Sequence, residues 1–179
     1  FHDWQGVNII ADALVRLDEN FWYENKVYLI GDGPAHAEVC HKLKKVSSKN
    51  LVVKGWMNRS EIDNVLREVD FLLSPRPSCL ATETVVPLKV IDSMYYHTPL
   101  IATDVGGLTE ILLGSNFKAA LFIDKADPVE GLLKVFKARV DIEEYEKLQV
   151  DLVAASHRLV AWPQVATSYL SLFEEVASR

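Results

Sequence analysis

The sequence predicts an α/β fold built on a doubly wound parallel sheet, because short apolar runs alternate with helical segments along the chain. Such runs are typical of strands whose two faces are both covered by helices. Two of the runs end in glycine-containing turns, G-D-G-P at 31–34 and D-V-G-G at 104–107, that lead directly into helices. From residue 129 onward the pattern is helical, so we expect a helical C-terminal tail.

The first part of the chain follows this alternation. Gly6 leads into a helix whose apolar residues recur at helical spacing up to Leu17. Ser60, with Asp63 three residues later, resembles an N-terminal capping pair for a helix that reaches Val69. The other expected elements are an aromatic segment at 21–23, a strand at 26–30, a helix at 35–47 and a strand at 51–53.

Two further strands, expected at 71–73 and 100–103, both end close to the start of a helix. The carboxyl ends of parallel strands meet at one edge of a sheet. Helix N-termini at that edge present unpaired N–H groups and the positive end of the helix dipole. We therefore expect this edge to bind a phosphorylated ligand.

The segment between these two strands carries the side chains suited to such a ligand. Glu83 is the lone carboxylate of a polar loop that follows the first strand. Pro87 opens a helix, a favoured first position because proline has no N–H to leave unpaired. Lys89 lies in the first turn of this helix, and Asp92 follows three residues later.

Beyond this segment we expect a strand at 119–123 and a helix that starts at the Asp127-Pro128 pair. This helix is expected to cover 129–140, and two further helices of the tail are expected at 142–160 and 163–177. In the last helix, an apolar stripe that includes Tyr169 and Phe173 predicts packing against the core, together with Trp162.

Composition limits the class of protein. The 179 residues correspond to about one domain. The net charge of −6 argues against a general nucleic-acid-binding surface. Cys40 and Cys79 have no metal-ligand spacing, so we expect free thiols. No apolar run approaches the ~20 residues of a membrane span. These features predict a soluble, cytoplasmic domain.

The expected sheet lacks its first strand. A doubly wound sheet normally starts with a strand that lies in the middle of the sheet, but here the first element is a helix. We therefore expect residues 1–179 to be a single Rossmann-like domain excised from a longer, two-domain chain.

Seven short segments point to a family. In chain order they are W-Q-G-V at 4–7, L-I-G-D-G-P at 29–34, V-K-G-W at 53–56, V-D-F at 69–71, P-L-K-V-I-D-S-M at 87–94, P-L-I-A-T-D-V-G-G at 99–107 and W-P-Q-V-A-T-S-Y-L-S-L-F at 162–173. Together, over nearly the whole chain, they resemble the C-terminal, nucleotide-sugar-binding domain of retaining GT-B glycosyltransferases of the group 1 family.

The resemblance implies roles for particular residues. Asp92 takes the place of the family's acidic residue that holds the ribose hydroxyls of the donor. Glu83 is the candidate for the catalytic carboxylate that contacts the transferred sugar. The resemblance also implies contacts with the donor nucleotide or its diphosphate, and these fall on Gly31, Gly33, Gly55, Trp56, Thr84, Pro87, Leu88 and Lys89.

Two features depart from the family pattern. The family has seven residues between its two acidic residues, whereas eight residues (84–91) separate Glu83 from Asp92. Either the loop bulges by one residue, or Thr84 occupies the place of the glutamate. The cation expected just before the first helix is Gln5, and the preceding strand that would carry a partner arginine is absent. Loss of one such charge commonly costs about 10²–10³ in rate.

The resemblance implies a hexosyl-type, retaining glycosyltransferase of glycan biosynthesis that uses a nucleoside-diphosphate sugar without a metal or other cofactor. The acceptor, which would be a glycan, a lipid-linked sugar or another molecule, would be held by an N-terminal domain outside this chain, so we expect this domain alone to be inactive. Peripheral contact with the inner face of a membrane stays open. Two alternatives also stay open: an assembly subunit with the same fold and an impaired site, and a sugar-nucleotide epimerase.

Overall fold

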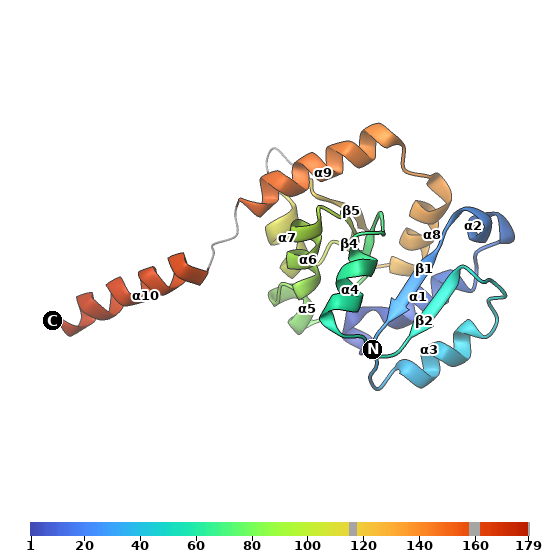
Figure 1. The fold of residues 1–179 in the computed structure, drawn as a ribbon, viewed down its shortest axis with the longest axis horizontal. Coiled ribbons are helices and arrows are strands. Elements are labelled where there is room, and N and C mark those ends of the chain that lie inside the picture. The colour runs from blue at the N-terminus through green and yellow to red at the C-terminus, as the bar shows by residue number, and fades with distance from the viewer. Residues whose placement is uncertain (115–117, 158–161, 179) are drawn as a thin grey trace.

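The computed structural model describes residues 1–114, 118–157 and 162–178, and it has the predicted α/β architecture (Figure 1). The strands are β1 (Val27–Ile30), β2 (Leu51–Lys54), β3 (Leu72–Ser74), β4 (Leu100–Thr103) and β5 (Ala120–Ile123). Every strand pair is parallel, as the alternation of strands and helices predicts.

The strands form two parallel sheets, which are the two parts of the β-structure. One part has the order β1-β2, with Val27 opposite Leu51, and the other has the order β3-β4-β5. Among the described residues, β1 pairs only with β2, and β3 pairs only with β4. In a doubly wound strand order, the expected first strand falls between β1 and β3, where these two parts are separate.

Helices connect the strands. Before β3 they are the 3-10 helix η1 (Asp3–Gln5), α1 (Val7–Leu14), α2 (Glu19–Glu24), α3 (His36–Leu43) and α4 (Arg59–Leu66). After β3 they are α5 (Leu80–Thr84), α6 (Leu88–Tyr96), α7 (Gly106–Leu112), α8 (Pro128–Ala138), α9 (Ile142–Ser156) and α10 (Trp162–Ala177).

Strand β4 is buried along its whole length, and its residues alternate between two apolar cores. Ile101 lies in a core with residues of α1, β1, α3 and α8, whereas Leu100 and Ala102 lie in a core with residues of α6, α7 and α9. Helices therefore cover both faces of this sheet, as predicted. The first core also contains Leu29 of β1 and Ile123 of β5, so it joins the two parts.

Several local expectations need correction. The N-cap of α4 is Asn58, whose side chain accepts from the Glu61 N–H at 3.0 Å, and not Ser60. Glu61 in turn accepts from the Asn58 N–H, because this pair has the full capping-box spacing. The aromatic residues at 21–23 lie within α2, which Asp18 caps through the Phe21 N–H. The loop expected around Glu83 contains the short helix α5.

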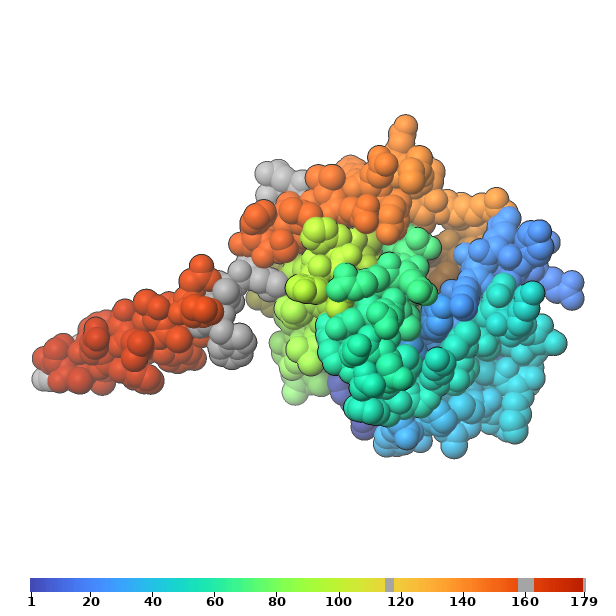
Figure 2. Space-filling view, viewed as in Figure 1, coloured from blue at the N-terminus to red at the C-terminus, as the bar shows by residue number. Residues whose placement is uncertain are grey.

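The expected packing of the C-terminal stripe is wrong for the described residues. Helix α10 extends away from the body of the domain (Figures 1 and 2), and Tyr169 and Phe173 are 56% and 62% exposed. Their rings pack against each other with centroids 6.1 Å apart. The expected end of the preceding helix near 160 and the packing of the Trp162 side chain lie outside what is described. Within the described ranges, no helix combines the length and the apolar character needed to cross a membrane.

Candidate functional site

The candidate site lies at the edge of the sheet where β3, β4 and β5 end. The loop after β3 leads into α5 and then α6, the loop after β4 leads into α7, and Asp124 and Lys125 follow β5. The N-termini of α6 and α7 therefore lie near the carboxyl ends of parallel strands, the arrangement that favours anion binding in open α/β sheets.

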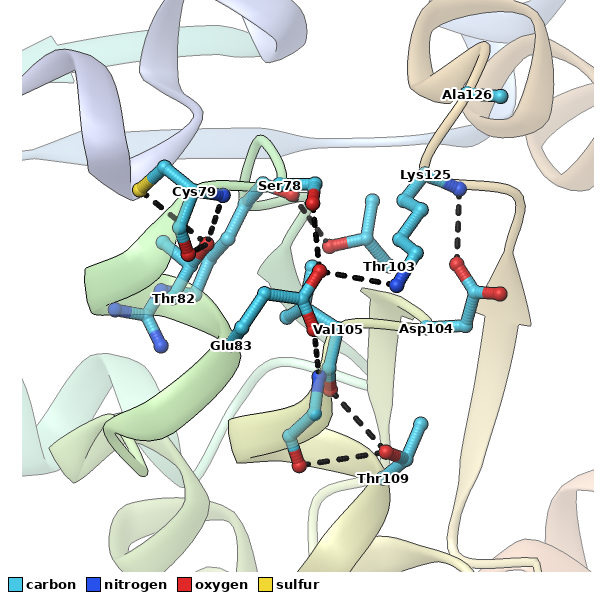
Figure 3. Close-up of polar contacts among 12 residues, drawn as sticks. Ser78, Cys79, Thr82, Glu83, Thr103, Asp104, Val105, Thr109, Lys125 and Ala126 are labelled. Carbon is cyan, nitrogen blue, oxygen red and sulfur yellow. Dashed lines mark hydrogen bonds and ion pairs between the residues drawn. The ribbon is translucent and has the colours of Figure 1, made fainter.

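Glu83 is at the centre of a network that joins three of these segments (Figure 3). Its Oε1 accepts from Ser78 Oγ at 2.6 Å and from Lys125 Nζ at 2.9 Å, and its Oε2 accepts from the Gly106 N–H at 2.7 Å. The bond from Ser78, followed by those from Gly106 and Lys125, lowers the pKa of Glu83 to about 2. The carboxylate is therefore ionised at neutral pH.

The start of α7 packs directly against α5. A Cβ placed on Gly106 would lie 2.5 Å from the Glu83 carbonyl oxygen, and one on Gly107 would lie 2.5 Å from that of Val85. Only glycine fits two backbones at this separation. Together with the bond from Gly106 to the Glu83 carboxylate, this contact fixes the position of α5 relative to β4.

Pro87 and Lys89 shape the start of α6. Pro87 is the N-cap residue, one position earlier than expected, and Leu88 is the first helical residue. Lys89 Nζ donates to the carbonyl oxygen of Leu73 in β3 at 2.9 Å. Desolvation of the ammonium, followed by the nearby charge of Arg76, lowers the pKa of Lys89. Leu88 is 80% exposed beside it.

Asp92 lies on α6 beside an open hollow of about 320 Å³ lined by Arg59, Leu88, Ile91, Asp92 and Tyr95. Its Oδ1 pairs with the Arg59 guanidinium at 2.9 Å, and the same guanidinium lies 2.6 Å from Asp63. Hydrogen bonds to Tyr96 and Asp92 raise the pKa of Arg59, so Arg59 stays charged. The predicted ribose-binding carboxylate thus already has a cationic partner.

The candidate residues after β1 and β2 form a second group. Gly31 and Gly33 have φ values of +142° and +144°, in the region that favours glycine. Phe1 lies against both, since a Cβ on Gly31 would be 3.1 Å from its ring and one on Gly33 would be 2.5 Å from its backbone nitrogen. Phe1 is therefore the residue that comes close to the backbone of this turn.

The other candidates in this set are exposed. No atom lies within 4 Å of a Cβ built on Gly55, and Trp56 is 80% exposed. Thr84 is exposed at the end of α5, where its hydroxyl donates to the Leu80 carbonyl oxygen at 2.8 Å. The Glu83 carboxylate therefore contacts the segments after β4 and β5, whereas the Thr84 hydroxyl forms a hydrogen bond only with the backbone of α5 among the described residues.

The N-terminal segment connects the two groups of residues. Phe1 contacts the turn after β1, and Gly6, with φ +77°, meets the loop after β3. A Cβ on Gly6 would lie 2.0 Å from the Pro75 carbonyl oxygen. Next to Pro75, the Arg76 guanidinium lies 5.4 Å from the centre of the Trp4 ring.

Sequence analysis missed four polar residues that contact the candidates or lie near them: Arg59, Arg76, Ser78 and Lys125. Arg76 lies between two prolines in S-P-R-P at 74–77, a sequence that indicates only the end of a strand. Lys125 is 42 positions from Glu83, so no local spacing could have revealed their contact.

Solved structures identify the fold. The HepE protein of Anabaena, in complex with UDP and glucose, matches with a TM-score of 0.70 and 16% identity over 100% of this chain and 46% of that chain. The catalytic domain of starch synthase IV from Arabidopsis thaliana, bound to ADP and acarbose, matches with a TM-score of 0.70 and 17% identity over 100% and 37% of the two chains. The fold is thus that of one half of a GT-B glycosyltransferase.

The sequence comparison identifies the family. The family model described as "Glycosyl transferases group 1" matches residues 1–138, and the chain belongs to this family. It is also 25% identical over 174 residues to an uncharacterized glycosyltransferase of Methanocaldococcus jannaschii, a match that covers 97% of this chain and 45% of the relative. The chain therefore spans slightly less than half the length of that relative.

Proposed function

We propose that this chain is the donor-binding part of a retaining glycosyltransferase that moves a hexosyl group from a nucleoside diphosphate to an acceptor. The observation that carries the proposal is Lys89 in the first turn of α6, at the carboxyl edge of a parallel sheet. The unpaired N–H groups of that turn and the lysine both favour the negative charge of a diphosphate.

Asp92 is the proposed ligand of the ribose hydroxyls. It lies one turn further along α6 than Lys89 and lines the hollow beside that helix. A carboxylate oxygen accepts hydrogen bonds from hydroxyl groups, and Asp92 has two such oxygens. Because Arg59 pairs with Oδ1, the donor either uses Oδ2 or shifts Arg59, and Arg59 then becomes a neighbour of the nucleotide.

Glu83 is the proposed contact of the transferred sugar, as the family resemblance implies. Ser78, Lys125 and Gly106 hold its carboxylate, so a sugar hydroxyl would join this network or replace Ser78 in it. Thr84 is the alternative at this place, with its hydroxyl exposed. Under the first assignment, substitution of Glu83 lowers turnover more than that of Thr84.

Metal-independent transfer with retention completes the proposal. The sequence contains no D-x-D motif, and helix N-termini with Lys89 would stabilise the leaving diphosphate. The front-face reaction would let that diphosphate help deprotonate the acceptor. The acceptor would bind a second domain outside residues 1–179. We place the protein in the cytoplasm, with contact to the inner face of a membrane left to the second domain.

The test is donor hydrolysis and sugar transfer by the full natural chain. Asp92→Ala is expected to abolish both, because the ribose loses its acceptor. Asp12→Ala is the matched control, since Asp12 is a partly exposed aspartate of α1 that also forms one ion pair, with Lys42 at 2.9 Å. Turnover of Asp92→Ala at the wild-type rate would contradict the proposal.

A second candidate is an assembly subunit that keeps the fold without catalysis. The observations that favour it are the neutral Gln5 and the three protein donors that already bind the two oxygens of the Glu83 carboxylate. A folded, full-length protein that binds no nucleotide but binds a catalytic partner tightly would support this candidate. The epimerase alternative predicts product from the donor alone, without an acceptor.

A further inference from the structure

Arg76 is a buried arginine that has no carboxylate partner within the part of the chain that the structure describes. The residue is only 2% exposed, in the loop after β3. Its Nη1 donates to the Val85 carbonyl oxygen at 2.7 Å, and its own carbonyl oxygen accepts from Thr103 Oγ1 at 2.7 Å. Its buried Nε has no acceptor among the described residues.

Such an arrangement is costly without a counter-charge. A buried charge normally has a partner of opposite sign and hydrogen bonds for its remaining groups. One carbonyl oxygen satisfies part of the Arg76 guanidinium and leaves its net charge uncompensated. Among the described residues no ion pair supplies this negative charge, and the unpaired Nε favours a bound anion.

Arg76 and Lys89 both lie at the start of α6. Arg76 Nη1 donates to the carbonyl oxygen of Val85, two residues before the N-cap Pro87, and Lys89 is in the first turn of the helix. The Lys89 ammonium donates to Leu73 in β3, and the Arg76 charge contributes to the lowered pKa of Lys89, after the larger effect of desolvation. Electrostatic interactions are mutual, so an anion next to Lys89 would be attracted by Arg76 as well. The two cations thus act on the same volume at the N-terminus of α6.

Arg76 also lies next to the place where the family has a cation. Its guanidinium is 5.4 Å from the centre of the Trp4 ring, and the neighbouring residue is the neutral Gln5. Gln5 uses its side chain locally, because its Oε1 accepts from the His2 N–H at 3.0 Å. Position 5 therefore supplies no positive charge to this edge of the sheet.

We propose that Arg76 and Lys89 together form the positively charged side of the diphosphate site, with Arg76 replacing the charge that is missing at Gln5. This inference rests on the proposed function, and it assigns a residue that sequence analysis did not. It predicts that Arg76 contributes to binding of the diphosphate and not to binding of the nucleoside.

The experiment compares diphosphates with nucleosides. Calorimetric titrations of the full natural chain use UDP, GDP and ADP, each paired with its own nucleoside. In Arg76→Gln, we expect the affinity for the bound nucleoside diphosphate to fall about tenfold or more, the size of one lost charge-assisted contact. The affinity for the nucleoside should stay within about twofold, because nucleosides have no charge for Arg76 to attract.

Two further variants sharpen the result. Arg139→Gln removes an exposed arginine that pairs with Glu24 at 2.6 Å, and we expect it to bind both ligands like the wild type. Gln5→Lys added to Arg76→Gln returns a cation to the edge and should recover most of the lost diphosphate affinity. If Arg76→Gln does not fold, Arg76→Lys decides: a retained preference for the diphosphate supports the inference, and loss of the preference overturns it.

The remaining outcomes separate failure of this inference from failure of the proposed function. Unchanged diphosphate binding in folded Arg76→Gln overturns the inference and leaves the proposed function intact. An equal loss for nucleoside and diphosphate also overturns it, because Arg76 then only orders the loop. The absence of binding of any of the three diphosphates by the folded wild type overturns the proposed function and this inference together.

Discussion

Replacing Gly6 by alanine is expected to destabilise the protein at the contact between the N-terminal segment and the loop after β3. Gly6 caps α1 with φ +77°, and its missing Cβ leaves room for the Pro75 carbonyl group. The variant therefore faces two penalties at once. Residue 6 must hold a left-handed conformation as alanine. The backbone at residue 6 and the backbone at Pro75 must also move apart to make room for the new Cβ.

The magnitude follows from these two terms. A left-handed conformation costs a non-glycine residue about 1–2 kcal/mol. A Cβ at 2.0 Å from the Pro75 oxygen forces a backbone shift, and overpacking of this kind costs about 1–3 kcal/mol. The lower entropy of the unfolded alanine chain returns about 0.4–1 kcal/mol. The net loss is about 1–5 kcal/mol, a large part of the roughly 5–15 kcal/mol that holds a typical domain together.

Urea unfolding followed by circular dichroism measures this loss as a lower transition midpoint. Gly55→Ala is the matched control, because Gly55 is a motif glycine with open space around it and no positive φ. We expect Gly55→Ala to leave the free energy of unfolding unchanged or to raise it by up to about 1 kcal/mol. A Gly6→Ala variant as stable as Gly55→Ala would refute the reasoning.

Two further predictions concern stability. Because the pKa of Glu83 is about 2 in the folded protein and 4.5 is the ordinary value, its network stabilises the protein above pH 4.5 and loses this effect as the pH falls toward 2. The difference in unfolding free energy between wild type and Glu83→Gln should therefore grow from pH 2 to pH 5 and then level off, and a constant difference would contradict the network. Leu108→Ala, at a fully buried position of α7, should cost about 2–5 kcal/mol in the same assay, whereas a cost below about 1 kcal/mol would be inconsistent with the packing of the second core.

The parts of the fold that sequence analysis predicted correctly are those with strong local signals. Strand β4 has the predicted bounds, Leu100–Thr103, because a buried parallel strand is a short apolar run that ends at a turn. The Asp127-Pro128 pair caps and opens α8, since Asp127 accepts from the Glu130 N–H and proline needs no donor there.

The errors have two physical reasons: at α10 the sequence does not show what covers the apolar face, and at α4 neighbouring residues compete for the cap. The apolar stripe of α10 has the periodicity of a buried face, but periodicity does not say what covers that face. Two overlapping capping pairs compete at the start of α4, and Asn58 with Glu61 forms the complete box.

The candidate site was predictable in part. Lys89 and Asp92 lie on α6 as expected, because helical spacing places residues three apart on neighbouring positions. Their partners, Leu73 and Arg59, come from a different strand and helix and could not be inferred from spacing. The same holds for Glu83, whose register was uncertain in the sequence and whose three partners come from separate segments.

The central claim is that this edge of the sheet binds the nucleotide of a sugar donor. Calorimetric titration of the full natural chain with UDP, GDP and ADP, repeated on Asp92→Ala, tests it most directly. The account predicts saturable binding of one nucleotide by the wild type, lost in Asp92→Ala while the fold remains intact. Binding that is equally strong in wild type and Asp92→Ala, or no binding by the folded wild type, would contradict it.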